Sequence, residues 1–247
     1  METGTGRKIA KALLGCFGVA MLITGIAMAI MSRGLFADWI TSKKKAVDAT
    51  EVEYGELETG SHVKLDVKMT LGAYMKHIES MKKGNSVVSS SATVYYLMPC
   101  LGEDESGTKI EYFLAFAVGN KSANSKKLNK LDEVFGEWWN DTTGEVAQPN
   151  EVKATIDGRV AKMSSKELKY LDEYFSKYLK SMDREDYIQS VVIRELWTDG
   201  TEQDAIMLMI MCGATTLIGI VMIFFALRRK RKNGKETAPS NAPQEQI

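Results

Sequence analysis

The sequence has few of the residues on which disulfide scaffolds and most hydrolytic enzymes depend. Its 247 residues include three cysteines, four prolines and two histidines. Cys16 and Cys212 fall inside long apolar runs, which leaves Cys100 as the single cysteine between them. No disulfide can therefore form within that central region. A region of this size has enough core to fold without one.

Charge is absent from two stretches of the chain. Residues 12–31 and 205–227 contain no charged side chain, and at 20 and 23 residues each is long enough to cross a bilayer as a helix. These runs argue against a plain soluble enzyme. We expect transmembrane helices at 12–31 and 205–227, with one domain at 32–204 between them.

The net charge of zero hides an uneven distribution. Residues 1–31 carry +2, residues 32–204 carry −6, and residues 205–247 carry +4. Five consecutive basic residues, Arg228 to Lys232, directly follow the second apolar run, and such a cluster is typical of the cytoplasmic side. We expect both termini, residues 1–11 and 228–247, in the cytoplasm and the central domain outside the cell membrane.

The C-terminal tail, residues 228–247, has a basic head followed by Pro, Asn, Gln and Ser. This composition predicts disorder. The basic head is interpreted as a topology signal in contact with lipid headgroups rather than as a docking site for a protein.

A cleaved signal peptide is an alternative interpretation of the first apolar run. Arg7, Lys8 and Lys11 form a basic start, and Ala27 and Ala29 match the small-x-small cleavage pattern. The run is longer than a usual signal sequence and continues past that site, which favours a membrane span. The central domain lies outside in either case.

Strand patterns dominate the first half of the domain. Residues 61–69 alternate polar and apolar side chains, which predicts a half-buried strand. Residues 70–83 fit a strand and a helix equally, and residues 85–91 suggest a loop. Residues 92–98 and 109–118 are rich in Tyr, Phe, Val and Leu and predict a central hairpin.

Helical patterns occur in the second half. Residues 125–139 predict an amphipathic helix, followed by a polar linker at 140–150. Residues 151–163 surround Asp157-Gly158, which indicates either a tight hairpin or a bulged strand.

A second helix is predicted next. Ser164 and Glu167 form a capping box that starts a helix with apolar spacing up to Met182. Residues 187–197 suggest a last strand. The chain thus predicts an α+β fold: an antiparallel or mixed sheet with two amphipathic helices, flanked by two transmembrane helices.

Three segments carry a resemblance to a known family. They are GELETGSHVKLDV, TVYYLMPCLGEDESGTKIEYFLAFAV and VKATIDGRVAKMSSKELKYLDEYFSKY, framed by the two apolar runs. Over roughly residues 7 to 230 the chain resembles an uncharacterised family of two-pass membrane proteins from clostridia-type Gram-positive bacteria. The resemblance implies two spans and one outer domain, and it implies no activity.

Candidate catalytic and metal-binding residues are scarce. His62 falls among charged residues on the polar face of its strand, and we expect it and His77 to be ordinary surface residues. Glu103, Asp104 and Glu105 do not have the spacing of a calcium loop and are interpreted as solvated charge. We therefore predict no catalytic residue, no cofactor and no metal site.

Two further patterns concern packing. The doublets Tyr95-Tyr96 and Trp138-Trp139 are interpreted as core residues rather than as a binding platform. Small residues recur every fourth position in both spans: Ala12, Cys16, Ala20 and Thr24 in the first, Thr215 and Gly219 in the second. Packing between the two spans of one chain is favoured over a homo-oligomer through these residues.

The sequence predicts a membrane-anchored binding or interaction module without catalysis, acting as an accessory or partner protein at the cell surface. Its expected partners are the lipid bilayer and a membrane or cell-surface protein, and the acidic outer region argues against nucleic acid. Two alternatives stay open: an extracytoplasmic sensor that modulates its helix pair, and a cell-envelope hydrolase that uses carboxylates.

Overall fold

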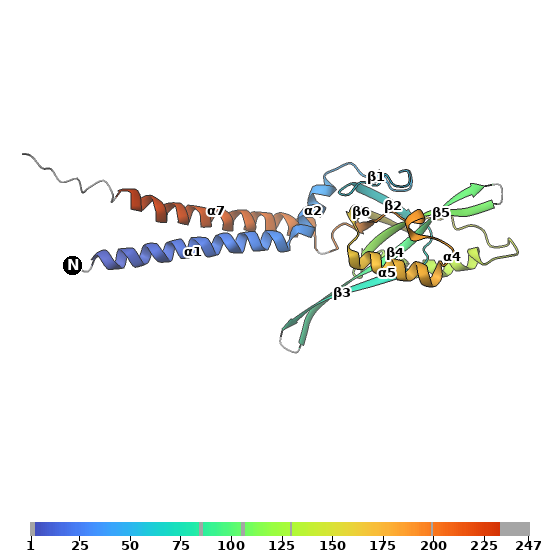
Figure 1. Ribbon diagram of the computed structural model, residues 1–247, viewed down its shortest axis with the longest axis horizontal. Helices are drawn as coiled ribbons and strands as arrows, with labels where there is room; N and C mark the ends of the chain where they lie inside the picture. Colours follow the sequence, from blue (N-terminus) through green and yellow to red (C-terminus); the bar gives the residue numbers. More distant parts are fainter. Residues whose placement is uncertain (1–2, 84–85, 105–106, 129, 199, 233–247) are drawn as a thin grey trace, which may run out of the picture. The chain divides into compact units, whose positions relative to one another are not determined.

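The computed structural model (Figure 1) describes residues 3–83, 86–104, 107–128, 130–198 and 200–232. These residues form two compact units. One lies within residues 1–36 and 202–247, and the other is Ala37–Thr201. The chain passes from the first unit to the second within helix α2, Arg33–Ser42.

The first unit is a pair of long helices, α1 (Thr3–Met31) and α7 (Glu202–Lys232). Among the described residues, two segments are long and apolar enough to cross a membrane, Ile9–Met31 in α1 and Glu202–Leu227 in α7. Their large apolar side chains are mostly exposed rather than packed in a core. Such an apolar outer surface is what a helix facing lipid requires.

Helices α1 and α7 approach each other most closely at glycines. A Cβ at Gly219 would lie 2.8 Å from the carbonyl oxygen of Gly18, and a Cβ at Gly25 would lie 2.4 Å from Oγ1 of Thr216. The two apolar helices of the chain therefore pack together, as expected, and Gly219 belongs to the contact. The stripe that the sequence suggested in α1 is wrong for this contact, because Ala12, Cys16, Ala20 and Thr24 are all exposed. The backbones approach most closely at glycine, where no side chain intervenes.

The end of α7 differs from the prediction. Disorder was predicted from residue 228, whereas the backbone is helical up to Lys232. Lys and Arg are good helix formers, and extending an existing helix requires no new nucleation. The rest of the predicted disordered tail, residues 233–247, lies outside the described residues.

The second unit is built around one mixed sheet, which confirms the predicted α+β class. Within the described residues its seven strands have the order β1-β2-β6-β7-β5-β4-β3. The pairs β1/β2 and β5/β7 are parallel and the other neighbours are antiparallel. The strands are β1 (Val47–Asp48), β2 (His62–Val67), β3 (Ala73–Lys83), β4 (Ser86–Asp104), β5 (Gly107–Gly119), β6 (Ala154–Lys162) and β7 (Val191–Glu195).

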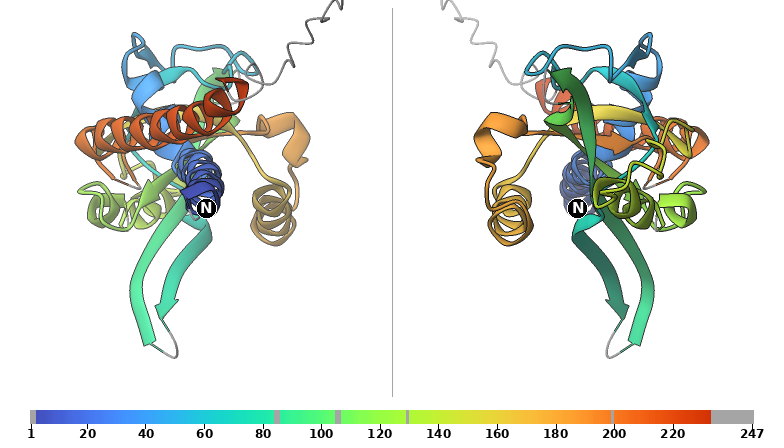
Figure 2. Two further views of the ribbon diagram at one scale, coloured as in Figure 1. Left: turned by 90° about the vertical axis from the view of Figure 1, so that its left-hand side faces the viewer. Right: turned by 90° about the vertical axis from the view of Figure 1, so that its right-hand side faces the viewer.

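Strands β3 and β4 form a ribbon that leaves the body of the sheet (Figure 2). The ambiguous segment 70–83 is a strand over most of its length, and the loop predicted at 85–91 is wrong because residues 86–91 belong to β4. The backbone groups of these residues pair with β3, from Ser86 opposite Lys83 to Ala92 opposite Ile78. Pairing across the ribbon outweighs the low strand propensity of a serine-rich segment.

Strand β6 is regular through Asp157 and Gly158, so the predicted hairpin or bulge is wrong. The strand pairs without a register shift with β2 on one side and with β7 on the other. A Cβ at Gly158 would lie 2.6 Å from Cγ2 of Ile193. Glycine is needed here because the neighbouring strand approaches closely, and not because the chain turns.

Both faces of the sheet are covered. One apolar core gathers around Leu65, Phe116 and Ile156, and it includes Leu128 of α3 (Ser125–Leu128) and Leu131 of α4 (Leu131–Trp139). The other core includes residues of α5 (Ser165–Tyr178), which Figure 2 shows on one side of the sheet together with the short α6 (Arg184–Tyr187).

The predicted capping box at the start of α5 is confirmed. The Ser164 hydroxyl accepts a hydrogen bond from the Glu167 amide at 3.3 Å, and the Ser164 amide donates to Oε2 of Glu167 at 2.6 Å. The helix ends at Tyr178, one turn before the predicted end at Met182.

Candidate functional site

His62 is buried, so the prediction of a solvated surface residue is wrong. It is 8% exposed, with Nδ1 lying 2.8 Å from the Lys44 carbonyl oxygen and Nε2 lying 2.5 Å from Oδ1 of Asp157. The reason is tertiary: the chain after α2 folds back and pairs through β1 with β2. Both ring nitrogens of His62 are used in holding these segments together.

The other predicted polar residues are not brought together. His77 is half-buried on β3 and Glu103 is exposed on β4. The side chain of Asp104 and all of Glu105 lie outside the described part of the structure. In the part that is described, no group of three or more His, Cys, Asp or Glu side chains could hold a metal ion.

The aromatic doublets behave differently from each other. Tyr95 and Tyr96 are both buried, one in each core, which confirms their interpretation as core residues. Trp139 is 44% exposed and stacks on Phe135 with ring centroids 5.6 Å apart. Because α4 ends at Trp139, the last ring of the doublet projects beyond the core.

A polar junction joins both ends of the domain to strand β6. Asp38 is 4% exposed; its Oδ1 lies 3.1 Å from Nε of Arg159, and its Oδ2 accepts a hydrogen bond from the Trp197 amide. Trp197 has a φ of +63°, a left-handed conformation that costs energy in a residue other than glycine. The Asp38 contact holds that conformation.

The junction continues on the other side of Gly158. Asp157 contacts His62 through its carboxylate, and its carbonyl oxygen accepts from the Leu196 amide at 2.9 Å. The chain that follows α1 and the chain that precedes α7 are thus both tied to the segment Asp157–Arg159. Sequence patterns missed this junction because its contacts join residues that are 39 to 159 positions apart in the chain.

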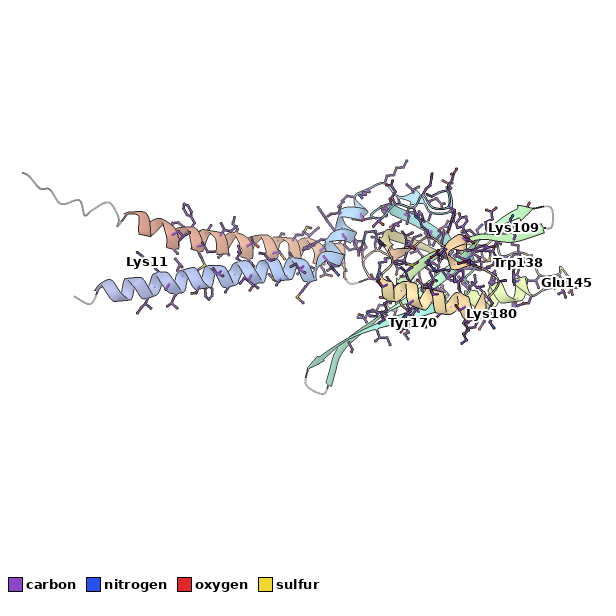
Figure 3. All side chains as sticks on the ribbon, in the orientation of Figure 1. Lys11, Lys109, Trp138, Glu145, Tyr170 and Lys180 are labelled. Atoms are coloured by element: carbon purple, nitrogen blue, oxygen red, sulfur yellow. The ribbon has the colours of Figure 1, made fainter. Side chains whose placement is uncertain are left out.

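The domain has a polar groove with a volume of about 540 Å³. We call it the Tyr112 groove. Its walls come from β1, β2, β4, β5 and the loop of residues 148–152, and its polar lining includes Asp48, Asp66, Lys68, Cys100, Glu111 and Tyr112. Figure 3 labels Lys109 on β5 and Glu145 in the 140–150 linker. Later residues of these two segments line the groove.

A β-bulge directs Glu111 into the groove. Cys100 pairs with Tyr112, whereas Leu101 pairs with Ile110, so Glu111 is an extra residue in β5. The bulge brings two consecutive side chains, Glu111 and Tyr112, to the same groove, which a regular strand would not do. A Cβ at Gly102 would lie 2.2 Å from the Glu111 carboxylate, so the glycine makes room for it.

Burial changes the acidity of the groove's phenol and thiol. It raises the pKa of the Cys100 thiol to about 12, although a hydrogen bond with Tyr112 acts in the opposite direction. Burial also raises the pKa of Tyr112 to about 12, helped by neighbouring Cys100. Both groups are protonated at neutral pH. A protonated thiol is a poor nucleophile, so Cys100 is not activated for covalent catalysis.

Comparison with known proteins identifies a family without assigning an activity. Residues 6–228 match a family described as a domain of unknown function (DUF8577), and the chain belongs to this family. No curated protein and no solved structure matches the chain. The match extends through both apolar helices and the sheet domain, so the family is defined by the whole arrangement.

Proposed function

We propose that the chain is a two-pass membrane protein whose domain lies outside the cell membrane and acts as a non-catalytic binding module. The observation that carries the proposal is that one folded domain, Ala37–Thr201, is flanked on both sides by helices long and apolar enough to span. The resemblance to two-pass proteins of clostridia-type Gram-positive bacteria supports this topology.

The charge pattern supports the orientation. Arg228 to Lys232 follow the second apolar segment directly, and such clusters stay on the cytoplasmic side. An even number of crossings then places both termini inside. The partner is a membrane or cell-surface protein, and the outward stripe of Ala12, Cys16, Ala20 and Thr24 offers a seam for a second helix.

Labelling of single cysteines on intact cells tests the topology. With Cys16, Cys100 and Cys212 replaced by serine, a cysteine introduced at exposed Thr108 should react with a membrane-impermeant maleimide. Cysteines introduced at Thr3 and Ser240 should react only after the membrane is permeabilised. Labelling of Ser240→Cys from outside would refute the proposed orientation, and loss of the Thr3 site from the mature protein would favour a cleaved signal peptide.

A sensor is the second candidate, and the Asp38 junction favours it. Because the junction ties the chain after α1 to the chain before α7, a rearrangement of the domain would act on both connections at once. A relay of this kind predicts that the helix pair responds when the junction is weakened.

Crosslinking within the helix pair tests the relay. A Cβ at Gly15 lies 3.9 Å from Cβ of Ala226, so a Gly15→Cys, Ala226→Cys pair should form a disulfide. Its rate of formation in membranes should change when Asp38→Asn is added, and stay constant with the control Glu137→Gln. Equal rates with and without Asp38→Asn would argue against the sensor.

A further inference from the structure

The Tyr112 groove continues into a second depression. This neighbour, of about 430 Å³, shares Thr50, Glu111 and Tyr112 with the groove and adds the segment Glu51–Tyr54 to the lining. Glu111, displaced by the β-bulge, therefore stands where the two depressions meet. Together they form an elongated polar surface rather than a single closed pocket.

An aromatic pair forms part of this surface. The rings of Tyr54 and Tyr112 lie 5.3 Å apart between centroids, at an angle of 42°. Tyr54 is held in place because its hydroxyl donates to the Glu185 carbonyl oxygen at 3.3 Å. The faces of such rings attract organic cations, most strongly where carboxylates stand beside them.

The charges of the lining have one dominant sign. Asp48, Asp66 and Glu111 line the groove, Glu51 and Glu53 line its neighbour, and Lys68 is the one basic side chain among these described lining residues. Asp48 and Asp66 accept hydrogen bonds from Thr50 and Thr155. Within the described structure, the carboxylates of Glu51, Glu53 and Glu111 accept no hydrogen bond and join no ion pair.

We propose that this surface binds a small, flexible organic polycation, such as a molecule with several ammonium groups on an alkyl chain. The inference rests on the proposed function, because it names the ligand class of the outer binding module. Spaced carboxylates along two joined depressions match spaced ammonium groups, and the tyrosine pair accommodates the alkyl segments between them. A single metal ion does not fit this arrangement, because the carboxylates are spread over both depressions.

Calorimetric titration of the full chain in nanodiscs of zwitterionic lipid tests the proposal, with spermine as the probe. Spermine should bind, its affinity should fall as salt is raised from 20 to 300 mM, and citrate should not bind. Glu111→Gln and Glu53→Gln should each weaken spermine binding by about tenfold, the loss expected for one charged hydrogen bond. Tyr112→Leu should weaken binding by a smaller factor.

The matched control is Glu137→Gln, which removes the same charge from an exposed position on α4 away from the groove. It should keep the affinity of the unchanged chain. Equal losses in Glu137→Gln and Glu111→Gln would overturn the site, because they would indicate attraction to the overall charge. A lysine-rich peptide that binds tighter than spermine would overturn the small-molecule class.

Failure of this inference and failure of the proposed function are distinguishable. Absence of spermine binding in a chain whose Thr108→Cys probe is labelled from outside would overturn the ligand and leave the proposed topology intact. Spermine binding by a chain whose Thr108→Cys probe is protected would overturn the location and leave the ligand class intact.

Discussion

Asp38 shows how one carboxylate can join distant parts of a chain. It lies seven residues after the end of α1 and contacts both Arg159 and the backbone of Trp197, five residues before α7 begins. A buried carboxylate must be paired because its desolvation is costly. Here the partners are a guanidinium and an amide, so the two connections of the domain are held by the same side chain.

Glu167, at the start of α5, is a second buried carboxylate that joins distant parts of the chain. Burial opposes its charged form, but the Ser164 amide and the Arg194 guanidinium outweigh this effect and lower the pKa of Glu167. Nη2 of Arg194 lies 2.6 Å from Oε1 of Glu167, while Nη1 lies 3.1 Å from the Tyr95 hydroxyl oxygen. The capping box that local sequence predicts is therefore also a tertiary contact with β7 and β4.

Replacing Ser164 by alanine should destabilise the domain by about 0.5–2 kcal/mol, because the Glu167 amide loses its acceptor at the helix N-terminus. The measurement is chemical denaturation of residues 37–201. Ser165→Ala, at the exposed first helical position, is the control and should change stability little. Equal stability of Ser164→Ala and the unchanged domain would mean that the cap contributes nothing.

At the scale of elements, whether a segment forms a strand depends more on its pairing partners than on the strand propensity of its residues. The serine-rich start of β4 and the Asp157-Gly158 segment of β6 both have turn-like composition, yet both are strand. Strand β6 lies between β2 and β7, so its backbone groups are paired on both sides. The β3–β4 ribbon has only its own two strands beyond Thr93, where pairing with β5 ends.

The helix pair illustrates the same point for side chains. Small residues at spacing four occur on several faces of α1, and the sequence alone could not select the contacting face. The structure selects the face with Gly18 and Gly25, because glycine permits the closest approach of the backbones. The exposed stripe from Ala12 to Thr24 is left for lipid or for another helix.

For the whole molecule, the junction defines where the sheet domain begins. A shorter fragment, residues 46–200, would still contain every described strand of the sheet, from β1 to β7. Such a fragment lacks Asp38, the partner of Arg159 and of the Trp197 amide, and it lacks the Lys44 carbonyl oxygen that His62 contacts. The folding unit therefore has to begin at Ala37.

A fragment of residues 37–201 should consequently be more stable than one of residues 46–200. The difference should be about 3 kcal/mol, because the shorter fragment leaves Arg159 without its buried partner, and the melting temperature should fall by roughly 6–12 °C. Calorimetry of the two fragments measures this difference. Asp38→Asn in the longer fragment should reproduce most of the loss. Equal melting temperatures of the two fragments would show that the junction does not contribute to the stability of the domain.

The sequence by itself determined the features that depend on local pattern or on composition. The two uncharged runs, the alternation in β2, the β4–β5 hairpin and the capping box of α5 each lie within a short stretch, so neighbouring residues suffice to specify them. These features were enough to predict an α+β domain between two apolar helices.

Only the tertiary structure decided which distant residues meet. The Asp38 junction, the burial of His62 and the Tyr112 groove each join residues that are distant in the chain, and one sequence carries no signal for such pairs. The bulge at Glu111 is specified by the register between β4 and β5, which depends on pairing along the whole hairpin. The residues of the candidate binding surface therefore come together only in the folded sheet. No common pattern in the sequence marks them.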